Sequence, residues 1–78
     1  MKLMVLNLPR DFNVDSLVEL FKTYGDVGIC NIVMDENTNI SKGFGFVEME
    51  KEDEATDAIT ALHQSKLGKN KIRVKLTN

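Results

Sequence analysis

Two phenylalanines spaced for one face of a strand are the residues of this chain best suited to chemistry. They lie in the run KGFGFVEM at residues 42–49. Side chains alternate along a strand, so Phe44 and Phe46 share a face with Lys42 and Glu48. Charged side chains are almost never fully buried unless paired, so this face is predicted to contact solvent. Two neighbouring rings on a solvated sheet face indicate a surface on which flat molecules stack.

The opposite phase of the same run is predicted to face the core. It holds Gly43, Gly45, Val47 and Met49. The alternative, in which both rings are core residues and the charges lie at the strand ends, would point two glycines outward. It would also leave the strand little apolar surface to hold it in the fold. Inward-pointing glycines would let a helix approach this strand closely.

The segments before this run are predicted to form a strand, a helix and a second strand. The apolar run 3–8 is typical of a central strand covered on both faces, and Pro9 ends it. Asn13 suits a helix N-cap and Gly25 the left-handed residue after the helix. The stripe between them comprises Leu17, Leu20, Phe21 and Tyr24, and Phe12 with Leu17 forms a hydrophobic staple. Residues 27–34 are mostly apolar with no helical period, which favours a strand.

The segments after this strand complete an alternating pattern. Residues 35–39 are polar and can turn, so the run at 42–49 returns antiparallel to the second strand. Asp53 can cap a second helix, whose apolar stripe comprises Ala55, Ala58, Ile59 and Leu62. Residues 71–76 alternate basic and aliphatic side chains, which is typical of a half-buried strand with a positive solvent face.

The predicted order is therefore β-α-β-β-α-β. It indicates an α+β fold, a ferredoxin-like sandwich with a four-stranded antiparallel sheet and two helices on one face. Seventy-eight residues permit one domain, spanning 1–78, and make an elaborate catalytic cavity improbable on size alone. Because this fold hosts enzymes, metal carriers and binding modules, the uncovered sheet face has to indicate the function.

Charge and cysteine content narrow the classes of function. The formal charge of -2 argues against a general nucleic-acid binder, yet residues 65–78 carry five bases and no acid. The single cysteine, Cys30, excludes an internal disulfide and a multi-cysteine metal site, and fits a packing residue in a reducing compartment. The apolar run near the N-terminus is far too short for a signal-peptide core or a membrane span. We expect a cytoplasmic protein without a metal or other cofactor and without a membrane.

Over residues 2–77 the chain resembles the RNA-recognition motif family, and two motifs carry the resemblance. The octamer 42–49 fits the family pattern K/R-G-F/Y-G/A-F-V-x-F/Y at six of its seven specified positions. The hexamer LMVLNL at 3–8 is similar to the family's first-strand motif, aliphatic-aromatic-aliphatic-x-N-L. In the family these two strands are adjacent at the sheet centre. The chain's length resembles the small one-domain versions found in bacteria.

The resemblance implies roles for individual side chains. Phe46 would stack on a base, Phe44 would stack or pack against sugars, and Lys42 would approach a phosphate. Met4 stands where the hexamer usually has its stacking aromatic, and a thioether lacks a flat π-face. Leu6 lies on the same face, at a position that is often polar or charged. Two departures are conservative: Met49 faces the core, and Asn39 stands in for a turn glycine because asparagine tolerates left-handed backbone.

The remaining candidate residues extend this face on the outer strands. Lys71, Arg73 and Lys75 share the outer phase of the last strand, and Asn31 and Val33 lie on the second strand. Asn7 is better explained as a turn-capping residue than as an RNA contact.

Taken together, these residues predict weak binding of short single-stranded RNA, or DNA, without catalysis or a small-molecule substrate. The alternative is a protein partner on the same apolar face, including a second copy of the chain in a weak homodimer. An enzyme is the least favoured class, because the lone His63 has no nucleophile pattern beside it. The acidic run at 52–57 is read as a solvated helix face.

Overall fold

The strands and helices follow one another in the predicted order, with one addition near the C-terminus. A computed structural model describes residues 1–77. Its elements are β1 (Lys2–Leu6), α1 (Val14–Lys22), β2 (Cys30–Met34), β3 (Ser41–Glu48), α2 (Glu52–Leu62), β4 (Lys66–Leu67), β5 (Asn70–Lys71) and β6 (Arg73–Leu76). Asn78, the last residue of the predicted domain, lies outside the described residues. Within residues 1–77 neither helix is long and apolar enough to cross a membrane.

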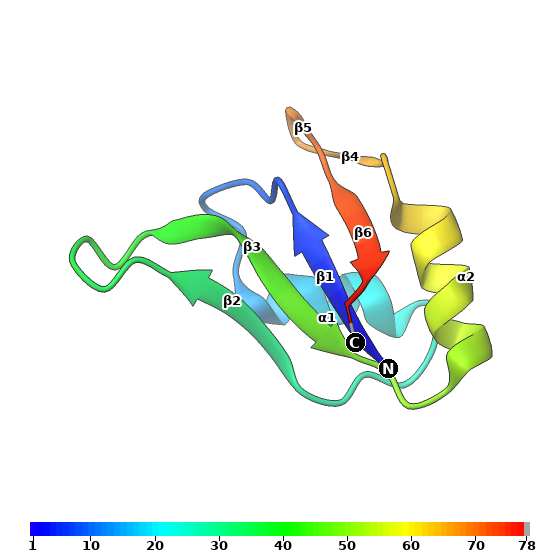
Figure 1. Ribbon diagram of the computed structural model, residues 1–78. Helices are drawn as coiled ribbons and strands as arrows, with labels where there is room; N and C mark the ends of the chain where they lie inside the picture. Colours follow the sequence, from blue (N-terminus) through cyan, green and yellow to red (C-terminus); the bar gives the residue numbers. More distant parts are fainter. Residues whose placement is uncertain (78) are drawn as a thin grey trace.

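The main sheet has the strand order β2-β3-β1-β6, and every pairing in it is antiparallel. β1 and β3, which carry the hexamer and the octamer, therefore lie side by side at its centre. Figure 1 shows α1 behind this sheet and α2 alongside β6, with none of the described helices or strands crossing the front. The predicted ferredoxin-like sandwich is confirmed.

The core lies between the sheet and the helices and uses alternate residues of each strand. Val47 and Met49 are fully buried, as predicted from the phase of the octamer. Both helical stripes are confirmed, with Leu17 and Phe21 buried in α1. The buried hydrophobic residues are Leu3, Val5, Leu8, Leu17, Phe21, Ile32, Val47, Met49, Ala55, Ala58, Leu62, Ile72 and Val74.

The predicted start of α1 is confirmed and its predicted end is wrong. The Asn13 side chain accepts a hydrogen bond from Ser16 N at 2.8 Å, as an N-cap does. The helix ends at Thr23 in right-handed backbone, and Gly25 does not have the left-handed conformation expected of it. Gly25 is instead a close-approach position, because a Cβ there would collide with the Glu54 side chain.

The predicted cap of α2 is also wrong. The residue at the cap position is Lys51, whose side chain makes no capping hydrogen bond. Asp53 lies inside the first turn with Glu52 and Glu54. Three carboxylates near the positive end of the helix dipole favour this terminus in place of a capping side chain.

The apolar run at 3–8 does not form a strand covered on both faces. Leu3 and Val5 are buried under the helices, whereas Met4 and Leu6 point to the other side and are only half-buried. The run is continuous because the uncovered face of β1 is itself apolar. That face is the candidate site.

The two outer strands differ from prediction at their ends. β2 begins at Cys30 rather than Val27, although Gly28 N still donates to Glu48 O at 2.7 Å. The alternating segment 71–76 is interrupted at Ile72, and its first residue belongs to a small β4–β5 hairpin that was not predicted. Gly68 makes the turn of this hairpin with φ at 61°.

In the octamer Gly45 makes room for strand backbone, not for a helix as predicted. A Cβ on Gly45 would collide with Asn31 O in β2, and one on Gly43 would meet Leu8 O at 3.5 Å. Gly43 also has φ at 86°, which an L side chain rarely adopts.

We expect Gly45→Ala to destabilise the protein by about 1 to 3 kcal/mol, because β2 must move away from β3 to admit the methyl group. Urea unfolding measures the loss. Gly28→Ala is the matched control, since its Cβ would have no neighbour closer than 3.5 Å. Equal stability of the two variants would contradict the predicted clash.

Candidate functional site

The uncovered side of the main sheet, here called the open face, carries two cross-strand rows of side chains. In the first row Met4 pairs with Phe46 on one side and Lys75 on the other, and Phe46 pairs with Asn31. In the second, Leu6 pairs with Phe44 and Arg73. Cross-strand partners share a face, so seven of the ten predicted site residues lie in two adjacent rows.

The two rings of the open face are perpendicular to each other. Phe44 and Phe46 are both half-buried, with ring centroids 6.2 Å apart and planes at 84°. This edge-to-face contact fixes their orientation. Two parallel bases cannot stack on both rings at once, so the rings are suited to different parts of a ligand.

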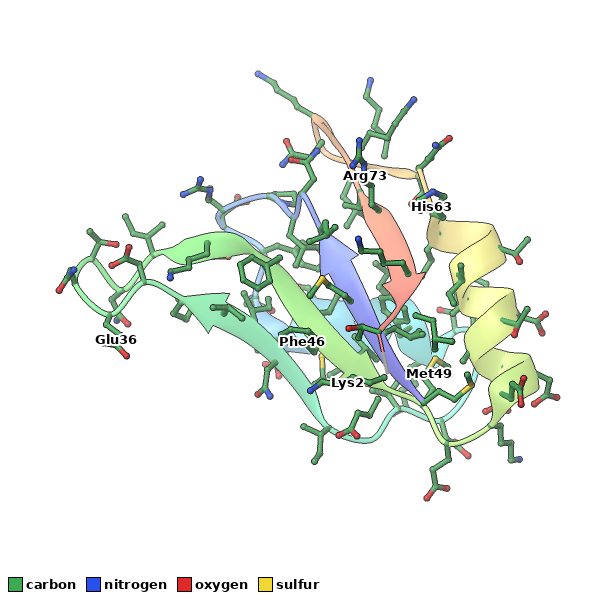
Figure 2. All side chains as sticks on the ribbon, in the orientation of Figure 1. Lys2, Glu36, Phe46, Met49, His63 and Arg73 are labelled. Atoms are coloured by element: carbon green, nitrogen blue, oxygen red, sulfur yellow. The ribbon has the colours of Figure 1, made fainter. Side chains whose placement is uncertain are left out.

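Lys2 is a member of the open face that was not among the predicted site residues. Its Nζ lies 4.7 Å above the centroid of the Phe46 ring, and Figure 2 shows the two side chains together. Lys2 precedes the hexamer, but it lies on the same side of β1 as Met4 and Leu6. This alternation could have predicted its place on the open face. Across the sheet it pairs with Glu48.

Exposed cations border the open face. Arg73 and Lys75 lie on β6 at one edge, and Lys42 lies on β3. Lys71 is exposed too but belongs to the β4–β5 hairpin rather than to the main sheet. Arg10, which was not predicted, lines a shallow hollow together with Lys42 and Phe44.

The pairing of β2 with β3 is irregular beside Lys42 and Phe44. The pairing of β2 with β3 shifts register between Ile32 and Met34, beside Val33, which is half-buried. The Ser41 hydroxyl accepts a hydrogen bond from Gly43 N at 3.0 Å, and Gly43 O accepts one from Leu8 N at 2.7 Å. Irregular pairings of this kind are frequent next to functional sites.

Asn7 has the structural role predicted for it. Its backbone is left-handed, with φ at 63°. Its Nδ2 donates to Lys71 O at 2.9 Å, and its own carbonyl accepts from Asn70 Nδ2 at 3.1 Å. These two bonds tie the end of β1 to the hairpin.

Cys30 and His63, the two side chains that could suggest catalysis, lie in surroundings that favour a structural role. Burial raises the pKa of the Cys30 thiol, which disfavours the reactive thiolate. His63 Nδ1 accepts a hydrogen bond from Val74 N at 3.1 Å on the outer side of β6. No group of three His, Cys, Asp or Glu side chains in residues 1–77 could hold a metal ion.

A family model for the RNA recognition motif matches residues 3–73. The chain belongs to the RNA recognition motif family. The octamer and hexamer of this family thus occupy the two central strands, with Phe44, Phe46 and Met4 on the open face.

Similar proteins carry this domain within longer chains. The chain is 43% identical over 68 residues, 87% of its length, to the 28 kDa chloroplastic ribonucleoprotein of Spinacia oleracea. It is 39% identical over 77 residues, 99% of its length, to glycine-rich RNA-binding protein 1 of Mycosarcoma maydis. It spans 29% and 44% of these two relatives, less than half of either. The single-domain resemblance to bacterial proteins stays a prediction.

A solved structure with RNA has the same fold. It is described as the SXL-lethal protein/RNA complex, and it superposes on this chain with a TM-score of 0.92 at 36% identity. The match covers 97% of this chain and 47% of that one.

Proposed function

We propose that this domain binds short single-stranded RNA, and single-stranded DNA by the same contacts, on its open face. One base stacks on Phe46, Phe44 packs against a neighbouring sugar or base, and cations at the border of the face contact phosphates. The observation that carries the proposal is the pair of rows that join Phe44 and Phe46 to Arg73 and Lys75 across β1. Membership of the family and the likeness to a protein–RNA complex support it.

Lys2 has to move before a base can stack on the upper face of Phe46. A cation–π contact at an exposed site is worth about 0.5 to 1 kcal/mol, whereas a stacked base gains about 1 to 3 kcal/mol. The free energy gained by stacking a base therefore exceeds the loss of the cation–π contact between Lys2 and Phe46. The displaced ammonium stays on a flexible stem beside the nucleotide, where a phosphate oxygen or a base acceptor can replace the ring.

The mechanism needs no catalytic group. Unpaired bases offer π-faces for stacking, and Lys and Arg offset the phosphate charges. The negative net charge does not oppose this, because the acids of α2 lie outside the two rows of the open face.

Chemical-shift mapping with a randomised single-stranded RNA pentamer tests the proposal. We expect the largest amide shifts at Asn31, Phe46 and Lys75, which form one row. Asp15 and Glu19 on α1 are the internal control and are expected to stay unshifted. Shifts confined to the helices, or absent at saturating RNA, would reject this face as the RNA site.

A second candidate is self-association through the open face. It is favoured by Met4 and Leu6, two half-exposed aliphatic side chains beside the rings. Sedimentation velocity of the free protein separates the two functions. A dimer that RNA dissociates would show both functions competing for one surface, and a dimer that persists because no RNA binds would support the second candidate.

We expect Met4→Tyr to tighten RNA binding by up to about 1 kcal/mol, because the backbone at position 4 already presents its side chain beside Phe46. Fluorescence anisotropy with a labelled pentamer measures the change. Met34→Tyr is the matched control, because Met34 is an exposed methionine outside the two rows of the open face. Unchanged affinity in a folded Met4→Tyr variant would indicate a different partner for this face.

A further inference from the structure

A hollow at the end of β1 is lined in part by Gln64, which takes part in none of the contacts described above. Its lining residues are Leu6, Asn7, Gln64, Lys71 and Arg73. We call it the Gln64 hollow. It holds about 410 Å³, within the range of small-molecule sites, and no acidic residue lines it. Leu6 joins it to the second row of the open face, since Leu6 pairs with both Phe44 and Arg73.

The backbone around this hollow is unusual at two of its lining residues. Gln64 has φ at 67° and Asn7 has φ at 63°. Asparagine tolerates left-handed backbone, but glutamine gains nothing there and glycine would fit without cost. Hydrogen bonds hold the conformation, from Gln64 N to Ile72 O at 2.8 Å and from Ser65 N to Leu62 O at 3.0 Å. Strained residues of this kind cluster at binding sites.

The side chains that line the Gln64 hollow favour a flat ligand that carries several hydrogen-bond acceptors. Lys71 and Arg73 can only donate hydrogen bonds, and the flat guanidinium pairs with two adjacent acceptors. Leu6 offers an apolar surface, and the exposed Gln64 side chain offers both a donor and an acceptor. Among nucleobases, guanine has the adjacent acceptors O6 and N7 that arginine binds best, and it also has N–H groups for the glutamine carbonyl.

A phosphate group, like guanine, offers hydrogen-bond acceptors to Lys71 and Arg73, but it is not flat. It would satisfy Lys71 and Arg73 while leaving Leu6 against a charged group. Guanine uses all of the lining chemistry. Figure 2 shows Arg73 at the end of β6 that adjoins the hairpin, beyond the ring of Phe46 along the sheet.

We propose that the Gln64 hollow is a base-selective subsite for guanine, one nucleotide beyond the rings. This inference rests on the proposed function, because the guanine arrives as part of a strand held on the open face. It assigns to Gln64 and Arg73 the selection of a base, whereas Phe46 accepts any base.

The first test moves one guanine through the five positions of a pentauridylate. We expect one position to bind about 5-fold or more tightly than pentauridylate, and adenine at that position to give no such gain. Arg73→Lys keeps the charge but loses the two-pronged contact, so the guanine-to-uracil affinity ratio is expected to fall below about 2-fold. Lys75→Ala, which removes a cation from the other row, should weaken all these RNAs and leave the ratio unchanged.

The second test uses Gln64→Gly, which removes the amide and the backbone strain together. We expect the melting temperature to rise by about 4 to 8 °C while the guanine-to-uracil ratio falls. Asn39→Gly is the matched control, because Asn39 has φ at 60° in the β2–β3 turn. It should leave the ratio unchanged.

Three outcomes would overturn the inference. In the first, guanine gives the same gain at every position or at none. In the second, the ratio survives Arg73→Lys and Gln64→Gly. In the third, a terminal phosphate on pentauridylate gives the gain that guanine does not. Failure of wild type to bind any pentamer would instead reject the proposed function.

Discussion

Replacing Phe46 with alanine is expected to weaken RNA binding by about 1 to 3 kcal/mol, which is 5- to 150-fold in affinity. The ring is half-buried on the open face, where it offers a flat surface next to Met4 and Asn31. Its removal should cost the fold less than the roughly 3 to 5 kcal/mol typical of a core phenylalanine. Anisotropy titration and thermal melting measure the two effects on one sample.

Phe21→Ala provides the opposite control. Phe21 is fully buried, so its truncation should cost the fold about 3 to 5 kcal/mol and leave the affinity of the remaining folded protein unchanged. Phe46→Leu keeps apolar contact without a flat ring and should retain most of the stability while losing most of the stacking. If melting shows Phe46→Ala to be more destabilising than Phe21→Ala, the assignment of faces is wrong.

The fold and the centre of the site were predictable because they depend on local alternation. Lys42 and Glu48 fix which side of the octamer contacts water, and that choice places both rings on the open face and Val47 in the core. The family resemblance then fixes which strands are neighbours, and the pairing of Met4 with Phe46 confirms it. Both steps use information contained within a few consecutive residues.

The border of the site was less predictable because it depends on backbone and tertiary geometry. The left-handed backbone of Gln64 has no signal in the sequence, unlike that of Asn39, where asparagine itself indicated it. The β4–β5 hairpin has strands of two residues each, too short to show a period. Arg10 reaches the face only because the β1–α1 loop returns beside Gly43.

The errors at the two helix ends have different physical causes. Asp53 and Gly25 are residues that suit caps, and each lies within two residues of a helix end. At position 25 a tertiary contact decides, because the Glu54 side chain accepts a hydrogen bond from Asp26 N at 3.2 Å and a Cβ on Gly25 would collide with that side chain. At the start of α2 the helix begins one residue before Asp53, which places three carboxylates in its first turn. Local propensity is a weak guide wherever tertiary contacts compete with it.

The affinity of the isolated domain is expected to lie in the micromolar to millimolar range. Two rings offer about 2 to 6 kcal/mol of stacking before the cost of ordering a flexible strand. A millimolar dissociation constant corresponds to about 4 kcal/mol and a micromolar one to about 8 kcal/mol. Duplex RNA should bind more weakly still, since its bases are not free to stack.

Salt is expected to have a large effect on this affinity. On pentauridylate, which has no guanine to occupy the Gln64 hollow, about three of the four cations Lys42, Lys71, Arg73 and Lys75 are expected to contact phosphates. Log K then falls with log salt at a slope near -2, taking roughly -0.7 per contact on single strands. A tenfold rise in salt then weakens binding about 100-fold. Each cation that contacts a phosphate contributes to the slope, so Lys75→Ala should reduce the size of the slope by about 0.7 and Lys22→Ala, on α1, should leave it unchanged.

A slope near zero would point most directly to a protein ligand for the open face, because burial of Met4, Leu6 and the rings is insensitive to counterions. A nanomolar constant, or a preference for duplex over single strands, would contradict stacking as the source of the affinity.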